Sequence, residues 1–210
     1  MKRIAVLVSG NGTLFETLTT RCCAGIIPAE IVLMISSSAN AGALERAQRL
    51  NVPFVVVKRE DCASDEEFAE RLLGELNSCA VDVICLAGYL KLIPTSVVRE
   101  YKQRMLNIHP ALLPGFGGKG MYGHRVHEAV IESGVRISGA TVHLVDDEYD
   151  HGPIVLQRAV FVKPDDTADT LAERVHAIEH DLYTDAVRLL CENRLRVEGR
   201  RVFILPVQRK

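Results

Sequence analysis

Short apolar runs alternate with longer amphipathic segments along this chain, and that alternation constrains the fold more than any other feature. The strand-like runs are residues 3–9, 30–37, 53–57, 81–87 and 104–109. The helix-like segments between the first four runs are residues 13–24, 41–50 and 65–77. Nearly continuous apolar composition, as in "RIAVLVS", is typical of parallel strands that are buried on both faces. The pattern predicts an α/β fold built on a single doubly wound, mostly parallel sheet.

The last third of the chain predicts an antiparallel edge on this sheet. Strand-like segments at 137–145 and 153–160 are joined only by the acidic turn "DDEYDHG" at 146–152. So short a connection suits antiparallel neighbours, whereas parallel strands need a long crossover. No linker interrupts the pattern, so we expect one domain over residues 1–210. The other elements expected here are helices at 124–133 and 168–192 and a short strand at 201–205.

Composition and charge exclude several classes of protein. The 210 residues are 48% hydrophobic and carry a net charge of −2, without the basic excess of nucleic-acid-binding proteins. No apolar run approaches the roughly 20 residues of a membrane span, and the run Ile4–Val8 is too short for a signal peptide. The six cysteines form no C-x-x-C pair. We therefore expect reduced thiols in a cytoplasmic protein.

The segment "NIHPALLP" at 107–114 places two polar side chains at a strand end. Asn107 and His109 are two residues apart, so in an extended strand they point to the same side. Pro110 lacks an amide donor and favours ending the strand there. An amide and an imidazole that face one space suit the stabilisation of an oxyanion. The alternative is an ordinary strand end whose polar side chains meet water.

Two further unusual stretches also follow predicted strands, where open α/β sheets bind their ligands. "SGNGT" at 9–13 links the first strand to the first helix, and "LAGYLKLIP" at 86–94 follows the fourth strand. The first lacks both a third glycine and a G-K-[ST] ending, so it matches neither a dinucleotide loop nor a Walker loop. Amides at a helix N-terminus favour a phosphate monoester, although an ordinary strand-to-helix turn has the same composition.

The turn at 146–152 carries four carboxylates within five residues. A solvated hairpin turn accounts for such a composition. Alternatively, one of the carboxylates reaches His109, orients its ring and raises its pKa. The residue pattern does not distinguish among the four.

"HAIEH" at 176–180 matches the H-x-x-E-H pattern of inverted zinc proteases. His176 and His180 would share one helical face, as zinc ligands require. A third ligand should come from well downstream, where the only carboxylates are Glu192 and Glu198. We therefore expect no metal site.

Taken together, these motifs resemble the folate-dependent phosphoribosylglycinamide formyltransferases over nearly the whole chain. The matching stretches, in the family's order, are "VLVSGNGT", "LAGYLKLIP", "NIHPALLPGF", "SGATVHLVDDEYDHGPIVLQ" and "IEHDLY". The resemblance implies an enzyme that transfers the formyl group of 10-formyltetrahydrofolate to the amine of 5′-phosphoribosylglycinamide in purine biosynthesis. It implies small-molecule substrates, no tightly bound cofactor, no nucleic-acid or membrane partner, and a monomer or homodimer.

The resemblance also assigns roles to individual residues. It implies catalytic roles for Asn107, His109 and Asp150, with the amide and the imidazole donating to the oxyanion and the carboxylate assisting. The expected ribotide contacts are Gly12, Thr13, Leu14 and Glu179. The expected folate contacts are Asp65, Leu90, Lys91, Leu92, Ile93 and Asn107, with the turn 146–150 bordering the pterin.

Two positions depart from the family pattern. Leu14 stands where asparagine is usual, which matters little if the loop binds through its backbone. Asp65 stands where a basic residue is common, and its carboxylate would repel the glutamate tail of the folate. The loop Gly115–His124 is longer than in some relatives and receives no role from the resemblance.

Three other interpretations of the chain remain. A 10-formyltetrahydrofolate hydrolase would use the same three residues with water as the nucleophile, but such hydrolases carry an extra N-terminal domain. Methionyl-tRNA formyltransferases carry a further C-terminal domain. A nucleotide-sensing module would keep the sheet and the glycine loop but would bind its ligand without turnover.

Overall fold

The computed structural model describes residues 1–207, which group into two compact units, Met1–Leu106 and Asn107–Lys210. Both units combine strands with helices, and strands β1 to β7 belong to a mostly parallel sheet with one antiparallel strand. The predicted α/β class with an antiparallel edge is therefore confirmed. The expectation of a single domain over residues 1–210 stays a prediction.

In the first unit, four strands lie in the order β3-β2-β1-β4, and the pairs β1–β2, β1–β4 and β2–β3 are all parallel. The central strand β1 is flanked on both sides, and residues Ile4–Val8 within it are completely buried. This burial explains its unbroken apolar sequence. The elements of this unit are β1 (Lys2–Val8), α1 (Thr13–Cys23), β2 (Ala29–Ser36), α2 (Ala43–Arg49), β3 (Phe54–Val56), η1 (Arg59–Asp61), α3 (Asp65–Ser78), β4 (Val83–Leu86) and α4 (Thr95–Glu100).

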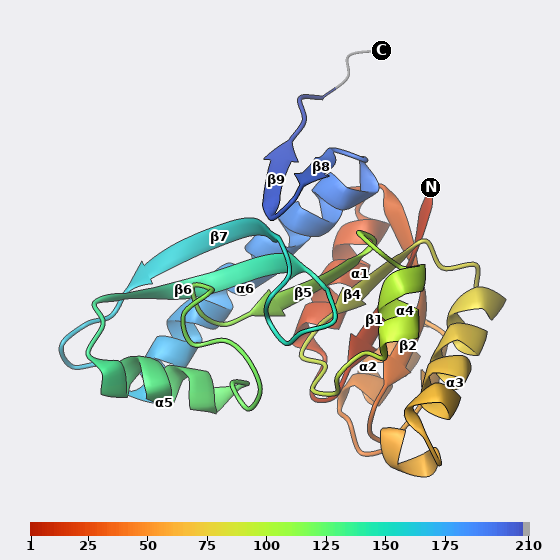
Figure 1. Cartoon of the computed structure of the whole chain (residues 1–210), viewed down its shortest axis with the longest axis horizontal. Helices are drawn as coiled ribbons and strands as arrows, with labels where there is room; N and C mark the ends of the chain where they lie inside the picture. Colours follow the sequence, from red (N-terminus) through yellow and green to blue (C-terminus); the bar gives the residue numbers. More distant parts are fainter. Residues whose placement is uncertain (208–210) are drawn as a thin grey trace. The chain divides into compact units, whose positions relative to one another are not determined.

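The second unit continues from β5, whose bounds Met105–His109 begin just before it. Its strands follow the order β5-β6-β7, with β6 and β7 antiparallel, and a separate hairpin pairs β8 with β9 (Figure 1). Both α5 and β7 pack with the long helix α6. The elements of this unit are α5 (His124–Ser133), β6 (Ile137–Leu144), β7 (Ile154–Phe161), α6 (Ala168–Cys191), β8 (Leu195–Glu198) and β9 (Arg201–Ile204).

Most expected elements appear within two residues of their predicted bounds, and the helix at 124–133 matches α5. Three short elements were missed, namely η1, α4 and β8. The strand β8 is four residues long and two of them are charged, so its composition shows no apolar run. None of the helices described is long and apolar enough to cross a membrane.

Candidate active site

The carboxyl end of β5 presents Asn107 and His109, and the strand ends at His109, directly before Pro110. His109 is only 3% exposed, whereas Asn107 is half-buried. The amide Nδ2 of Asn107 donates to Nε2 of His143 at 3.1 Å and to Oδ1 of Asp150 at 3.4 Å. The second distance is long, so the hydrogen bond from Asn107 to Asp150 is weak.

Asp150 is the carboxylate of the 146–152 turn that reaches β5. Its Oδ2 lies 3.4 Å from Nδ1 of His109 and accepts a 3.0 Å hydrogen bond from the backbone amide of Gly118. Its backbone has φ +52°, which non-glycine residues rarely adopt and which is common at functional sites. The structure thus brings Asp150 into contact with both Asn107 and His109, while the catalytic roles of the three residues stay a prediction.

The electrostatics of the pair differ from expectation at His109. Burial lowers the pKa of His109, and the Asp150 carboxylate and the Phe116 carbonyl offset this only in part. Asp150 does raise the imidazole pKa, as expected, but desolvation outweighs the ion pair and the net shift is downward. Burial raises the pKa of Asp150, but the neighbouring rings of His143 and His109 and the Gly118 amide together lower it below its usual value.

His143 is a functional candidate that the sequence reasoning missed. It lies in β6, is 2% exposed, and its Nδ1 is 2.9 Å from the carbonyl oxygen of Leu144. A carbonyl only accepts, so Nδ1 carries the proton and a neutral ring accepts from Asn107 at Nε2. The same Nε2 lies 3.7 Å from Oδ1 of Asp150. The available signal was a polar residue inside the otherwise buried strand "ISGATVHL".

Thr141, two residues before His143 on β6, fixes the chain that follows His109. Its buried hydroxyl donates to the carbonyl of Ala111 at 2.7 Å and accepts from the amide of Leu113 at 3.0 Å. Gln157 of β7 donates to the same hydroxyl and to the Leu113 carbonyl, each at 2.9 Å. This network holds the segment after β5 against the antiparallel pair.

The glycine-rich loop after Pro114 closes over the site, which gives the Gly115–His124 segment a structural role. The carbonyl of Phe116 accepts a 2.8 Å hydrogen bond from Nε2 of His109, and the amide of Gly118 binds Asp150. A Cβ on Gly117 would lie 2.5 Å from Leu113 and 3.2 Å from the Cβ of Asp150. The loop therefore needs glycine at 117 to approach the carboxylate this closely.

In the first unit, the "SGNGT" loop forms a helix N-terminus with no side chain over its amides. Gly12 is the N-cap residue of α1 and has φ +71°. A Cβ there would lie 2.6 Å from the Cβ of Ala43 in α2, so close packing also requires glycine. Thr13 and Leu14 begin the helix. Arg46 supports the loop by donating to the Asn11 carbonyl at 2.7 Å.

The predicted folate segment is tied directly to this loop. The amide of Leu90 donates to Oγ of Ser9 at 2.9 Å, and the amide of Ser9 donates to the Gly88 carbonyl at 3.1 Å. Leu90 and Leu92 are 50% and 47% exposed, so the segment that is bonded to the "SGNGT" loop presents apolar surface. Ile93 is 3% exposed, and its side chain belongs to the core.

Two charged residues among the predicted folate contacts already have partners. Lys91 lies 3.7 Å from Glu60, and Asp65 accepts from Nε of Arg59 at 2.6 Å. The charge of Asp65 is thus balanced by a guanidinium beside it. Ser64 caps α3 by accepting from the amide of Glu67, and the Glu67 carboxylate accepts from the amide of Ala63.

Glu179 of the "HAIEH" segment lies on α6 and is 6% exposed. Burial raises its pKa to about 7. Its Oε2 is 3.8 Å from Nε2 of His176, whose side chain is largely exposed. Within residues 1–207, no group of three histidine, cysteine or acidic side chains is arranged to hold a metal ion.

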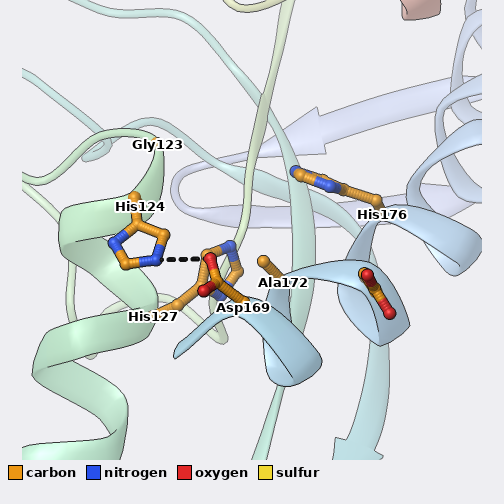
Figure 2. A pocket seen from close by; sticks show the side chains of 7 residues that line it. Gly123, His124, His127, Asp169, Ala172 and His176 are labelled. Atoms are coloured by element: carbon orange, nitrogen blue, oxygen red, sulfur yellow. Dashed lines mark hydrogen bonds and ion pairs between the residues drawn. The ribbon is translucent and has the colours of Figure 1, made fainter. Parts of the chain in front are cut away.

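A cavity of about 550 Å³ opens between α5 and α6. Figure 2 shows His124 and His127 on α5 facing Asp169 on α6, with a 2.9 Å contact between Nε2 of His124 and Asp169. His127 is 1% exposed, and neither ring nitrogen has a hydrogen-bond partner in the described part of the chain. Burial lowers its pKa to about 4, so this ring is neutral at pH 7. The lining residues are Gly123, His124, His127, Asp169, Ala172, Glu173 and His176.

Comparison with known proteins agrees with this geometry. The formyl transferase family model matches residues 2–187. The chain is 45% identical to the chloroplastic phosphoribosylglycinamide formyltransferase of Arabidopsis thaliana, over 93% of this chain and 67% of that protein. It is 36% identical to the phosphoribosylglycinamide formyltransferase of Haemophilus influenzae, over 97% of this chain and 94% of that protein.

Solved structures show the same likeness. The crystal structure of glycinamide ribonucleotide transformylase 1 from Symbiobacterium toebii is 41% identical, with a TM-score of 0.93 over 98% of this chain and 95% of that chain. A formyltetrahydrofolate deformylase from Pseudomonas syringae shares the fold at 23% identity, with a TM-score of 0.88 over 98% of this chain and 66% of that chain. The family match, the identities and the fold lead to one conclusion: the chain belongs to the phosphoribosylglycinamide formyltransferases of the formyl transferase family.

Proposed function

We propose that this enzyme transfers the formyl group of 10-formyltetrahydrofolate to the amine of 5′-phosphoribosylglycinamide, a step of purine biosynthesis. The observation that carries the proposal is the contact among Asn107, His109 and Asp150 at the end of β5. The names of the relatives supply the ribotide, and the resemblance of the sequence motifs to folate-dependent formyltransferases supplies the formyl donor. Both substrates are small molecules, the folate is a co-substrate and not a bound cofactor, and a cytoplasmic monomer or homodimer is expected.

The reaction begins when the amine attacks the formyl carbon and the carbonyl oxygen becomes an oxyanion. Asn107 is placed to donate to that oxygen, because its second hydrogen is held only by the 3.4 Å bond to Asp150. His143 keeps the amide oriented through the 3.1 Å bond to the first hydrogen. Removing a donor of this kind commonly raises the barrier by about 3 kcal/mol.

His109 needs a change in its surroundings before it donates to the oxyanion. Its Nε2 donates to the Phe116 carbonyl, and its Nδ1 faces Asp150. A substrate oxygen therefore reaches Nε2 when Phe116 withdraws. The negative charge that develops on the oxygen then favours the protonated ring, against the burial that lowers the pKa of His109.

Asp150 serves two purposes in this scheme. Its charge stabilises a protonated His109 through Nδ1, and its low pKa keeps it ionised at neutral pH. As an ionised carboxylate it accepts the proton that the attacking amine must lose, directly or through water. The tetrahedral intermediate then collapses: the bond between the formyl carbon and N10 of the folate breaks, and N10 takes up the proton that the amine released, so tetrahydrofolate leaves and no covalent enzyme intermediate is required.

Each substrate has a proposed subsite. The ribotide phosphate binds the backbone amides at the start of α1, at Gly12, Thr13 and Leu14, where the helix dipole favours an anion. Glu179 accepts hydrogen bonds from the ribose hydroxyls. The folate lies along Leu90–Ile93 and Asn107. Because Arg59 balances the charge of Asp65, the glutamate tail meets less repulsion there than the sequence alone suggests.

A folate-absorbance assay with the purified full chain tests the proposal. Deformylated folate should form only when both 10-formyltetrahydrofolate and the ribotide are present, and formylated ribotide should accumulate in equal amount. Folate product without ribotide would instead identify a 10-formyltetrahydrofolate hydrolase. Binding of both ligands without any product would identify a sensing module.

A further inference from the structure

The turn that carries Asp150 is held by a residue far along the chain. Arg200 lies at the tip of the β8–β9 hairpin, between the paired residues Glu198 and Arg201. The preceding Gly199 has φ +59°, as tight hairpin turns require. The strand β9 packs beside β7, which begins where the Asp150 turn ends (Figure 1).

Arg200 makes two separate hydrogen bonds to His151, the residue after Asp150. Its Nη2 donates to the His151 carbonyl at 2.6 Å, and its Nη1 donates to ring Nε2 at 2.8 Å. Because a guanidinium only donates, Nε2 of His151 must be the accepting nitrogen. The ring proton then sits on Nδ1 and is donated to Oδ2 of Asp146 at 2.8 Å. Donors and acceptors therefore match in both contacts, from Arg200 to His151 and from His151 to Asp146.

These hydrogen bonds link Asp146, at the start of the turn, to His151, near its end, on either side of Asp150. Asp146 begins the turn and also accepts from the amide of Glu148 at 3.1 Å. Gly152 ends it against β6, where a Cβ would lie 1.8 Å from the Leu144 carbonyl. Between these points, Asp150 adopts the unfavourable φ of +52°. A strained residue needs neighbours that over-determine its conformation.

We propose that Arg200 is a positioning residue, which acts through His151 and Asp146 to hold the Asp150 carboxylate against His109 and Asn107. The inference rests on the proposed function for its effect on turnover, but the contact itself is testable without catalysis. A carboxylate displaced by about 1 Å can cost a large factor in rate. The fork of arginine matters because a lysine ammonium cannot satisfy the carbonyl and the ring together in the same geometry.

The experiment compares Arg200→Ala with Arg201→Ala in the full chain. Arg201 belongs to the same hairpin but stacks on Phe203, with no role at the turn. Hydrogen–deuterium exchange of the amides at 147–151 should be about tenfold faster in Arg200→Ala and unchanged in Arg201→Ala. The kcat of Arg200→Ala should fall about tenfold with the KM for ribotide little changed, and Arg200→Lys should lie between it and the parent.

An NMR titration measures the pKa of His109 in the folded protein. A general loss of stability would not change this pKa, so the titration separates a positioning role from simple destabilisation. With the carboxylate displaced, the His109 pKa should fall further in Arg200→Ala and stay at the parent value in Arg201→Ala. Equal exchange, equal His109 pKa and equal kcat in the two variants would overturn the positioning role. If the parent protein transfers no formyl group, the proposed function fails, while exchange and titration still decide whether Arg200 holds the turn.

Discussion

The two ring nitrogens of His109 face different groups, and this asymmetry determines what the side chain can do. One nitrogen meets the Phe116 carbonyl and the other meets the Asp150 carboxylate. Because the ring is 3% exposed, each partner changes the cost of protonation strongly. Acid–base chemistry at this residue thus depends on the loop and the turn as much as on the imidazole.

Substitution of each member of the trio tests this arrangement. Asn107→Ala, His109→Ala and Asp150→Asn should each lower kcat by about 10²-fold or more, because each removes an oxyanion donor or the proton acceptor. Steady-state kinetics at saturating substrates measures the effect, and circular dichroism confirms that the variants are folded. Asp165→Asn, an exposed carboxylate in the loop before α6 and outside every predicted site, is the control and should keep parental kcat. Near-parental turnover of His109→Ala would contradict the mechanism.

At the level of elements, α1 offers backbone groups at its N-terminus, whereas the strand β6 contributes side chains. The helix presents backbone amides because its cap residue is glycine, and so its contribution to binding does not depend on a particular side chain. The strand instead contributes side chains at alternate positions, Thr141 and His143, which support the segment after β5 and the Asn107 amide. The two elements therefore predict different mutational effects.

For the helix, Thr13→Asp should raise the KM for ribotide by about tenfold or more and leave the KM for folate nearly unchanged. A carboxylate in the first turn of a helix interacts favourably with the helix dipole, so the variant should stay stable. The same negative charge should repel the bound phosphate. Thr13→Asn is the control, since it has nearly the same shape without the charge. Substituting Gly12 would also disturb Ala43, so it is a less specific test. Equal rises in both KM values for Thr13→Asp would argue against a phosphate site.

For the strand, Thr141→Val should lower the free energy of unfolding by about 2–3 kcal/mol, because buried groups lose their partner. The groups affected are the Ala111 carbonyl, the Leu113 amide and the Gln157 amide. Chemical denaturation measures the change. Thr141→Ser keeps the hydroxyl and should retain most of the stability, so equal losses in the two variants would show that packing, not hydrogen bonding, is responsible.

At the level of the whole molecule, buried ionisable groups connect stability to pH. Glu179 has the largest effect of this kind on α6, since its carboxyl is almost fully buried and its pKa is raised to about 7. In the unfolded chain the same carboxyl releases its proton near pH 4.5. Between these values the folded state holds a proton that the unfolded state has lost.

Stability should therefore fall as pH rises from about 4.5 to about 7, with no further change from this group at higher pH. The full effect is about 3 kcal/mol, at roughly 1.4 kcal/mol for each pKa unit. Urea denaturation across this range measures it, and Glu179→Gln should remove this part of the pH dependence. Glu173→Gln, exposed on the same helix, should leave it intact. An unchanged slope in Glu179→Gln would contradict the buried, raised-pKa carboxyl.

The sequence by itself determined the order and type of the main elements, because apolar periodicity and glycine or proline at their ends reflect local backbone chemistry. It also indicated Asn107 and His109 together, since side chains two residues apart on a strand share a face. Only the tertiary structure showed which carboxylate reaches His109 and that the Phe116 carbonyl accepts a hydrogen bond from the His109 ring. It also showed the contacts of His143 with Asn107 and of Arg200 with His151. Those contacts join residues separated by 7 to 49 positions along the chain. The structure also added the burial that outweighs the pKa rise expected from Asp150 at His109, because burial depends on everything that packs around a group and not on its neighbours in sequence.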